Sequence, residues 1–236
     1  MKLHRMMGIE QAARVTALVG GGGKTTSLLA LAAEARASGL RTAVLTTTHI
    51  FPPRRDGFEL LLSADTGAAE RAWDRGLAVA AGKLAADGRL LRPAPEMWDY
   101  LLRKADAVYV EADGSRGLPL KYPAAWEPVL PQETEQVLLL CGLTALDQPL
   151  DEYCHRAQLA RQELGLTERL IDEEVMARVL SAGYGRFRLT VIINQADTAA
   201  LAERGRKLAR LLAERGLSSS AVLSLHNILA EPGRTY

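Results

Sequence analysis

A run of four glycines followed by Lys24-Thr25-Thr26 is the feature that most constrains the fold of this chain. The run comes directly after the apolar stretch Val15–Val19 and before Lys24–Ser38, where apolar residues recur at the spacing of one helix face. Gly39 then supplies a helix C-cap, and Thr42–Thr47 has the composition of a second strand. The order strand, loop, helix, strand predicts an α/β protein with a mainly parallel central sheet.

The loop itself has the chemistry of a phosphate-binding site. Glycines let backbone N–H groups turn inward around an anion, and the helix N-terminus adds unpaired donors and the positive end of its dipole. A full Walker A motif requires a glycine where this chain has Leu18, so the loop resembles the shortened GxxGKTT form of some nucleotide-dependent ligases. We expect the phosphates of a nucleotide at Gly20, Gly21, Gly22, Gly23, Lys24, Thr25 and Thr26. The alternative is a strand–helix turn that binds nothing.

A second signal is the predicted strand Ala107–Glu111, which is followed by Asp113. A carboxylate at the end of a strand beside the loop would hold Mg²⁺, so we expect the metal at Thr25 and at Glu111 or Asp113. The expected catalytic residues are Lys24, Asp113 and Lys121, with Arg116 as a further candidate for stabilising phosphate charge. An ordinary Asp-Gly turn and solvated loop charges are the alternatives.

A third signal is Asn194-Gln195-Ala196-Asp197, again at the end of a predicted strand. It resembles the NKxD motif of GTPases, in which the aspartate accepts hydrogen bonds that guanine offers and adenine does not. Gln195 replaces the lysine whose stem packs over the base. We expect Asn194 and Asp197 to bind the base; alternatively, Asn194 is a turn residue and Asp197 caps the next helix.

The rest of the chain predicts one three-layer P-loop NTPase-like domain over residues 1–236. An irregular insertion at about 51–95 would contain a strand, a helix and a hairpin, and a helical insertion would lie at about 151–182. The insertion elements are expected at Glu59–Leu62, Thr66–Arg75, the hairpin Leu77–Ala81 with Arg89–Leu91, His155–Glu163 and Thr167–Ser181. Further elements are expected at Pro95–Lys104, Val137–Cys141, Leu189–Ile193, Asp197–Arg215 and Ala221–Leu225.

Composition narrows the functional classes. Lys and Arg number 29 against 28 Asp and Glu, and this balance argues against a chain that coats a nucleic-acid backbone. No apolar run approaches the roughly 20 residues of a membrane-spanning helix, and Met1–Glu10 lacks the apolar core of a signal peptide. The two cysteines, Cys141 and Cys154, are too few for a disulfide scaffold, so we expect a cytoplasmic protein.

Several segments together resemble the YqeC-type selenium-dependent hydroxylase accessory proteins. They are VGGGGKTT, LTTTHIFPP, VYVEADGSRGLPLK with the following EPVLP, GLTALDQPLDEYCHR and VIINQAD, from about Val15 to Asp197. The resemblance implies a cytoplasmic P-loop protein associated with the maturation of selenium-dependent molybdenum hydroxylases. It also implies a nucleotide on Gly20–Thr26 and adds weight to Glu111, Asp113, Lys121 and His155.

The leading hypothesis is an accessory NTPase that binds GTP with Mg²⁺ and acts on a molybdenum hydroxylase or a carrier of its cofactor. One alternative is a kinase- or ligase-like enzyme that uses ATP to activate a small acceptor near His49 and Lys121. The other is a binding module without catalysis, whose affinity for its partner changes with the bound nucleotide. Cys154 would matter in any of them if the chain handled selenium through a thiol.

Overall fold

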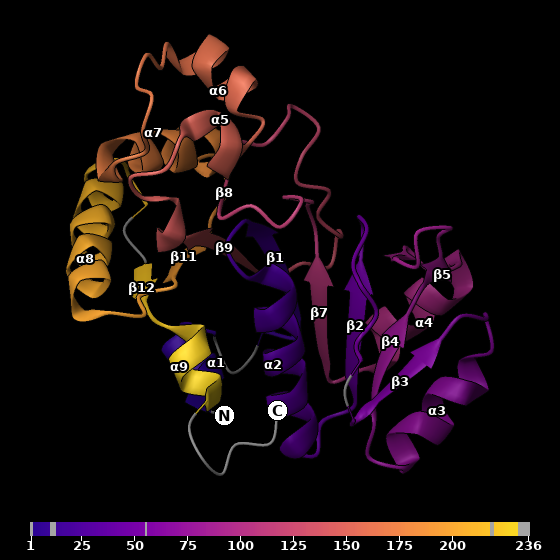
Figure 1. Ribbon diagram of the computed structural model, residues 1–236. Helices are drawn as coiled ribbons and strands as arrows, with labels where there is room; N and C mark the ends of the chain where they lie inside the picture. The colour runs from indigo at the N-terminus through magenta and orange to yellow at the C-terminus, as the bar shows by residue number, and fades with distance from the viewer. Residues whose placement is uncertain (1, 10–12, 55, 218–219, 231–236) are drawn as a thin grey trace.

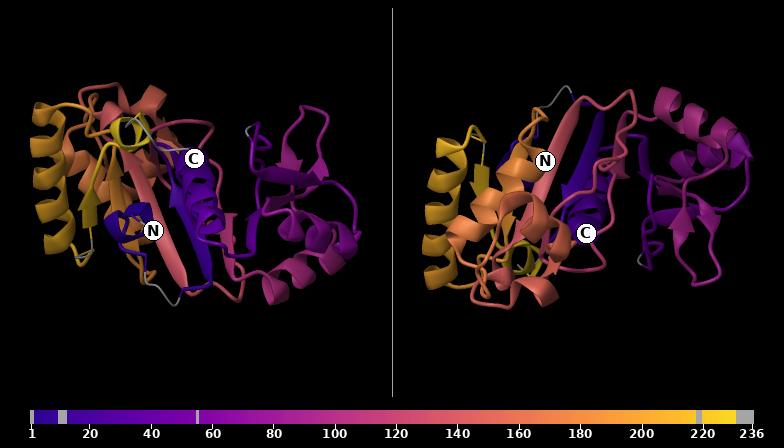
Figure 2. Two further views of the ribbon diagram at one scale, coloured as in Figure 1. Left: turned by 90° about the horizontal axis from the view of Figure 1, so that it is seen from below. Right: turned by 90° about the horizontal axis from the view of Figure 1, so that it is seen from above.

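The computed structural model describes residues 2–9, 13–54, 56–217 and 220–230; Met1 and Glu10, the ends of the stretch compared with a signal peptide, lie outside them. Eight strands form one sheet in which all described neighbours are parallel, and helices pack on both of its faces (Figure 1; Figure 2). This arrangement confirms the predicted three-layer α/β fold. In spatial order the strands are β12 (Ser220–Val222), β11 (Thr190–Asn194), β9 (Gln136–Gly142), β1 (Val15–Gly20), β7 (Ala107–Glu111), β2 (Thr42–Thr46), β4 (Ala78–Ala81) and β3 (Phe58–Leu61).

The helices divide into two layers according to the core cluster that each one joins. Apolar side chains of α1 (Lys2–Met6), α2 (Lys24–Ala37) and α9 (Leu225–Ala230) pack on one face of the sheet. The opposite face is covered by α3 (Thr66–Asp74) and α4 (Pro95–Lys104) at one end, and by α6 (Ala157–Leu164), α7 (Glu173–Tyr184) and α8 (Ala199–Glu214) at the other. The short helices α5 (Leu150–Tyr153) and η1 (Leu143–Ala145) lie in the connections.

The position of β1 determines where a ligand can bind. All six residues of β1 are buried, because helices cover both faces of the sheet and a parallel strand between them needs no polar side. The strand lies between β7 and β9. The strands of this sheet that follow it in the chain up to β7 all lie on one side of β1, and the later strands β9, β11 and β12 all lie on the other side. Open α/β sheets bind ligands at such a switch point, outside the carboxyl ends of the strands. Gly20, Thr46, Glu111 and Asn194 stand at this edge.

The predicted hairpin between Leu77–Ala81 and Arg89–Leu91 is wrong. β4 instead pairs in parallel with β2 and β3, and its four residues are buried, which suits an inner strand of the main sheet. The hairpin that does form is smaller and joins β5 (Lys83–Leu84) to β6 (Leu90–Leu91). Its turn contains Asp87 and Gly88: the Arg89 N–H donates to the Asp87 carboxylate at 3.1 Å, and Gly88 has φ of +78°.

Three predicted helix starts are also wrong. His155 belongs to β10 (Cys154–His155), which pairs in parallel with β8 (Leu120–Lys121), so the next helix begins only at Ala157. The helix expected from Thr167 begins at Glu173, where the Asp172 carboxylate accepts the Val175 N–H at 2.8 Å. Asp197 does not cap α8; the hydroxyl of Thr198 accepts the Leu201 N–H at 3.2 Å instead.

Within the described residues, no helix combines the length and the apolar character that crossing a membrane requires.

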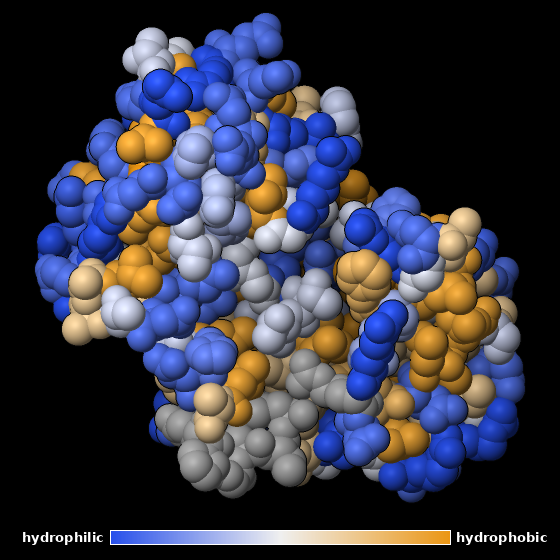
Figure 3. All heavy atoms as spheres, in the orientation of Figure 1, coloured by the Kyte–Doolittle hydropathy of each residue, from blue (hydrophilic) through white to orange (hydrophobic). Residues whose placement is uncertain are grey.

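Figure 3 shows apolar side chains gathered on the side of the molecule that carries β5 and α4. Leu60, Leu62 and Leu84 are among the exposed large hydrophobic side chains of this half of the sheet. Leu60 and Leu62 stand on β3 and just after it, and β7, β2 and β4 lie between that edge strand and β1; Leu84 stands on β5, outside the main sheet.

Candidate functional site

The glycine loop is pressed between two other backbone segments. A Cβ atom on Gly21 would lie 2.5 Å from the Leu118 carbonyl oxygen, and one on Gly22 would lie 2.3 Å from the Gly142 nitrogen. Gly22 also has φ of +72°, a conformation that residues with a side chain rarely adopt. These glycines are therefore required by the close approach of the segment after β7 and of the last residues of β9, and a bulkier loop would not fit between them.

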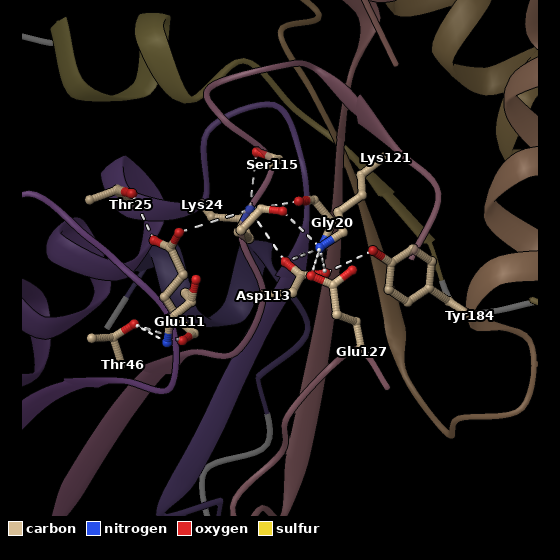
Figure 4. Close-up of polar contacts among 12 residues, drawn as sticks. Gly20, Lys24, Thr25, Thr46, Glu111, Asp113, Ser115, Lys121, Glu127 and Tyr184 are labelled. Atoms are coloured by element: carbon tan, nitrogen blue, oxygen red, sulfur yellow. Dashed lines mark hydrogen bonds and ion pairs between the residues drawn. The ribbon is translucent and has the colours of Figure 1, made fainter. Parts of the chain in front are cut away.

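Lys24 is the first residue of α2 and points back over the loop (Figure 4). Its ammonium donates to the Gly20 carbonyl at 2.6 Å and to the Ser115 hydroxyl at 3.2 Å. It also lies 3.4 Å from the carboxylate of Asp113 and 3.9 Å from that of Glu111. No side chain of the described residues caps the helix at Gly23, so the first N–H groups of α2 face the same space as the lysine.

Glu111 and Thr25 form the pair that best fits a magnesium ion. The Thr25 hydroxyl donates to Glu111 Oε2 at 2.7 Å, and both residues line the cavity described below. Burial raises the pKa of Glu111, and the neighbouring Lys24 partly opposes that shift. Magnesium is usually held by one or two protein oxygen ligands together with phosphates and water, and this pair supplies two adjacent oxygens. No group of three or more His, Cys, Asp or Glu suited to a metal occurs in the described part of the chain.

Asp113 lies beneath the loop and fixes its backbone. Its two carboxylate oxygens each accept the Gly20 N–H at 3.0 Å, and Oδ2 accepts the Tyr184 hydroxyl at 2.8 Å (Figure 4). The Lys121 ammonium lies 3.3 Å from Oδ2. The side chain of Asp113 is fully buried and does not line the cavity, which distinguishes it from Glu111. Of the two acids expected to bind the metal, Glu111 therefore has the access to do so, and Asp113 has the position of a structural anchor.

Lys121 continues this buried network away from the loop. Its ammonium donates to the Gly114 carbonyl at 2.7 Å and lies 3.1 Å from Glu127 Oε1, with no exposed side-chain surface. Burial alone would raise the pKa of Glu127, but hydrogen bonds from the Ala124 N–H, Arg156 and Lys121 outweigh it and lower the pKa. Lys121 thus does not line the cavity and lies behind the lining residues Gly114 and Glu127, which it contacts.

A cavity of about 650 Å³ opens over the loop. Its floor is the loop, the start of α2 and Glu111. Its wall comes mainly from the segments after β2, after β7 and around β10, with single residues before β6 and after β11. The wall residues include Thr48, His49, Ile50, Phe51, Arg89, Ser115, Arg116, Glu127, His155, Arg156 and Gln195. Of the predicted loop residues, Gly22 to Thr26 line this cavity together with Glu111 and His155, whereas Gly20 and Gly21 are buried and do not line it.

The end of β11 is connected to the phosphate loop. The Asn194 side-chain amide donates to the Gly22 carbonyl at 2.9 Å, and its oxygen accepts the Leu225 N–H at 3.0 Å. Asp197 is exposed, and its Oδ1 accepts the Ser224 hydroxyl at 2.5 Å. Gln195 lines the cavity and accepts the Thr144 hydroxyl at 2.6 Å. Asn194 thus positions backbone, while Asp197 stands at the surface beyond the cavity lining.

The wall residue His155 and the two buried cysteines have shifted pKa values. Burial, together with the positive charges of Lys121 and Arg156, lowers the pKa of His155 to about 4, so its ring is neutral at neutral pH. Burial raises the pKa of Cys141 and of Cys154 to about 12. A thiol with such a pKa is protonated at neutral pH and is a poor nucleophile. This finding argues against a role for Cys154 in carrying selenium.

Three residues of the site escaped the sequence reasoning: Ser115, Glu127 and Tyr184. Ser115 and Glu127 stand in a loop rich in glycine and proline, where a polar residue is ordinary. Tyr184 ends a helix with an apolar face and reads as a core residue. The local sequence around these residues does not indicate their partners, because each partner lies elsewhere in the chain. Ser115 contacts Lys24, Glu127 contacts Lys121 and Tyr184 contacts Asp113.

A family model described as YqeC protein matches residues 16–158. The chain belongs to the YqeC family. The matched segment contains the phosphate loop, Glu111, Asp113, Glu127 and His155, whereas Tyr184 and Asn194 lie beyond it. A curated relative in Escherichia coli (strain K12), described as uncharacterized protein YqeC, is 32% identical over 175 residues, which cover 68% of this chain. The chain spans 64% of the length of that YqeC relative.

Proposed function

We propose that the chain binds a nucleoside triphosphate with Mg²⁺ and hydrolyses it or transfers its terminal phosphoryl group. One observation carries this proposal: the uncapped N-terminus of α2, the Lys24 ammonium and the Thr25–Glu111 pair meet on the floor of a single cavity. Backbone N–H groups and an ammonium bind phosphate oxygens, and a hydroxyl next to a carboxylate suits the metal. Few other ligands would use all three.

Each floor residue then has a role. Lys24 would exchange the Gly20 carbonyl for the phosphates and neutralise their charge, while Thr25 and Glu111 would hold Mg²⁺. The ion, when bound, would neutralise further charge on the terminal phosphates. Asp113 and Lys121 would keep the loop in place from below. Catalysis of this kind consists mainly of positioning and charge stabilisation.

We propose guanine as the base. The segment that would read it adjoins the segment that would bind phosphate, since the amide of Asn194 donates to the Gly22 carbonyl at 2.9 Å. Ser224 holds one oxygen of the exposed Asp197 carboxylate, which fixes that carboxylate in a single orientation for hydrogen bonds from a base. These contacts support a role for Asn194 as the connection between the two segments and for Asp197 as the group that selects the base.

The process that the nucleotide would drive is proposed from the family resemblance alone. It is the maturation of selenium-dependent molybdenum hydroxylases or of their cofactor, with a hydroxylase or a cofactor carrier as the protein partner. Because both thiols are buried and protonated, we propose that the chain contributes nucleotide energy to this process and does not carry selenium itself.

A second candidate is ATP-dependent phosphoryl transfer to a small acceptor. The observation that favours it is the wall of the cavity, where Arg116, His155 and Arg156 come from chain segments other than the loop and could contact a second molecule. Base preference separates the two candidates, because this alternative uses adenine.

Calorimetric titration of the full chain with GTP and with ATP, each with Mg²⁺, tests the proposal. We expect tighter binding of GTP, and a loss of at least about 100-fold in affinity for Lys24→Ala, because its ammonium is the main charge on the phosphates. Lys83→Ala, at an exposed lysine of the β5–β6 hairpin, is the matched control and should bind like the wild type. Failure of both nucleotides to bind at millimolar concentration would defeat the nucleotide site.

Two further measurements divide the remaining possibilities. Asp197→Asn should weaken GTP binding about tenfold and leave ATP binding unchanged, because only guanine offers paired donors to this carboxylate. Tighter binding of ATP by the wild type would refute the guanine assignment. Phosphate release is then followed with Glu111→Gln as the inactive variant. A wild-type chain that binds nucleotide but releases no phosphate, even with candidate partners, would function as a nucleotide-gated binding module.

A further inference from the structure

Strained backbone is concentrated on the wall of the cavity. Four described residues other than glycine have positive φ, and three of them line this cavity: Arg116 at 54°, Arg156 at 64° and Gln195 at 66°. Such conformations cost of order 1 kcal/mol each in residues with a side chain, and they persist only where the surroundings impose them. Their concentration at one cavity indicates that the wall is built to present particular side chains.

Arg156 is held from three directions. Its guanidinium donates to the two oxygens of Glu127 at 3.1 and 3.3 Å, and its Cζ lies 5.6 Å from the ring centroid of Trp126. The preceding residue is fixed by the β8–β10 pairing, in which the Tyr122 N–H donates to the His155 carbonyl at 3.0 Å. The Arg156 side chain is nevertheless 31% exposed and lines the cavity, so a ligand can reach it.

Arg116 brings a second guanidinium next to the phosphate loop. It directly follows Ser115, whose hydroxyl accepts from the Lys24 ammonium at 3.2 Å. Arg116 is exposed on the cavity wall, and no acidic side chain pairs with it among the described residues. An unpaired guanidinium beside the lysine that would hold the terminal phosphate is suited to a second anionic group.

His155 directly precedes Arg156 in the chain and shares the cavity wall with both cations. It lines the same cavity, and the charges that act on it include those of Lys121, Arg156 and Arg116. An uncharged imidazole can donate one hydrogen bond and accept another, which suits an oxyanion that carries a neighbouring hydroxyl. Arginine, in turn, binds phosphate and carboxylate through two parallel hydrogen bonds.

We propose that Arg116, His155 and Arg156 form an oxyanion subsite, which binds a small molecule carrying a phosphate or carboxylate group beside the end of the nucleotide. The inference rests on the proposed nucleotide site and deepens it by naming the class of the second ligand. The loop and α2 would bind the nucleotide phosphates from the floor, whereas these three side chains come from the segments after β7 and around β10. The second ligand therefore has its own contacts and does not compete with the triphosphate.

The test uses the full chain saturated with Mg²⁺ and GppNHp, a GTP analogue that is not hydrolysed. Inorganic phosphate, and malonate in a separate titration, are added and followed by calorimetry. We expect one saturable phosphate site per chain, weakened at least about tenfold in Arg116→Ala and in Arg156→Ala. Arg103→Ala, at an exposed arginine of α4, is the matched control and should leave binding unchanged. A preference for malonate would identify the ligand group as a carboxylate and would equally support the subsite.

Three outcomes would overturn the proposal. The first is the absence of saturable binding of either anion, and the second is binding that is equally strong in the two arginine variants. The third is a loss of GppNHp affinity in Arg116→Ala as large as that in Lys24→Ala, because the guanidinium would then belong to the nucleotide. Arg116 is exposed, so its variant should fold even if Arg156→Ala does not.

Failure of the nucleotide site itself is recognised separately. If GppNHp does not bind, phosphate is titrated into the protein without nucleotide. Phosphate binding that is lost in Arg116→Ala and kept in Lys24→Ala would support the subsite without the nucleotide. If the wild type without nucleotide binds no phosphate, the subsite is overturned as well.

Discussion

Tyr184→Phe tests the buried network that supports the phosphate loop. The substitution removes one hydroxyl, which donates at 2.8 Å to Oδ2 of Asp113, and both side chains are fully buried. A hydrogen bond to a charged group contributes roughly 1.5–3 kcal/mol. Because the Gly20 N–H at 3.0 Å and Lys121 at 3.3 Å still contact Oδ2, we expect a loss of about 2 kcal/mol in the free energy of unfolding. For a chain of 236 residues this corresponds to a fall in Tm of about 4–8 °C.

Urea denaturation gives the free energy, and a second buried tyrosine gives the control. Tyr109 is also buried, but its hydroxyl pairs with His4, whose pKa is lowered by burial against the opposing effect of Glu34, which favours the uncharged ring at neutral pH. Tyr109→Phe should therefore cost only about 1 kcal/mol, as expected for a neutral pair. If Tyr184→Phe unfolds at the wild-type urea concentration, or costs no more than Tyr109→Phe, the Asp113 carboxylate does not need this donor and the network reasoning is refuted.

Three other perturbations have defined outcomes. Gly21→Ala would push a methyl group to within 2.5 Å of the Leu118 carbonyl oxygen, so we expect the urea midpoint and the nucleotide affinity to fall together. The control is Gly39→Ala, at a position with φ of +82° and nothing within 4 Å of the added methyl group. It should lower the free energy of unfolding by about 1 kcal/mol and leave the nucleotide affinity unchanged. Burial alone would raise the pKa of Glu173, but hydrogen bonds from Arg204, its own backbone N–H and Lys207 lower it from 4.5 to about 2. The stabilisation from the ionised Glu173 is thus fully present above about pH 4.5 and is lost as pH falls toward 2. In Glu173→Gln, the free energy of unfolding should therefore fall less steeply between pH 4.5 and pH 2 than in the wild type. Leu139→Ala, at a fully buried position of β9, should cost roughly 2–5 kcal/mol by urea denaturation, and a smaller loss would mean that the surrounding core collapses into the space.

The strand, loop and helix around the four glycines could be predicted almost to the residue, because the signals there are local. Glycine conformation, helical spacing and the C-cap at Gly39 act over a few positions and agree with β1 and α2. The meeting of Thr25 with Glu111 was also within reach. Parallel strands bring their carboxyl ends to one edge, so an acid that ends a strand next to β1 must stand beside the loop.

The remaining features depend on contacts that no local pattern encodes. β8 and β10 have two residues each, too few for a periodicity, and they form only because each supplies the other with hydrogen bonds. This pairing explains why the helix predicted from His155 starts later. β4 was assigned to a hairpin because a short apolar run before a turn is ambiguous, although a run buried at every position is typical of an inner parallel strand.

The contacts that complete the site join parts of the chain that are far apart. Asp113 lies 93 positions from Gly20 and 71 from Tyr184, and Asn194 lies 172 positions from Gly22. Closing loops of this length costs chain entropy before the contacts repay it, so distant pairings form late in folding. We expect β1 and α2 to be formed in early folding species that still lack a finished cavity. Nucleotide affinity would then appear only in the last step of folding, after the C-terminal half of the sheet has docked against the loop.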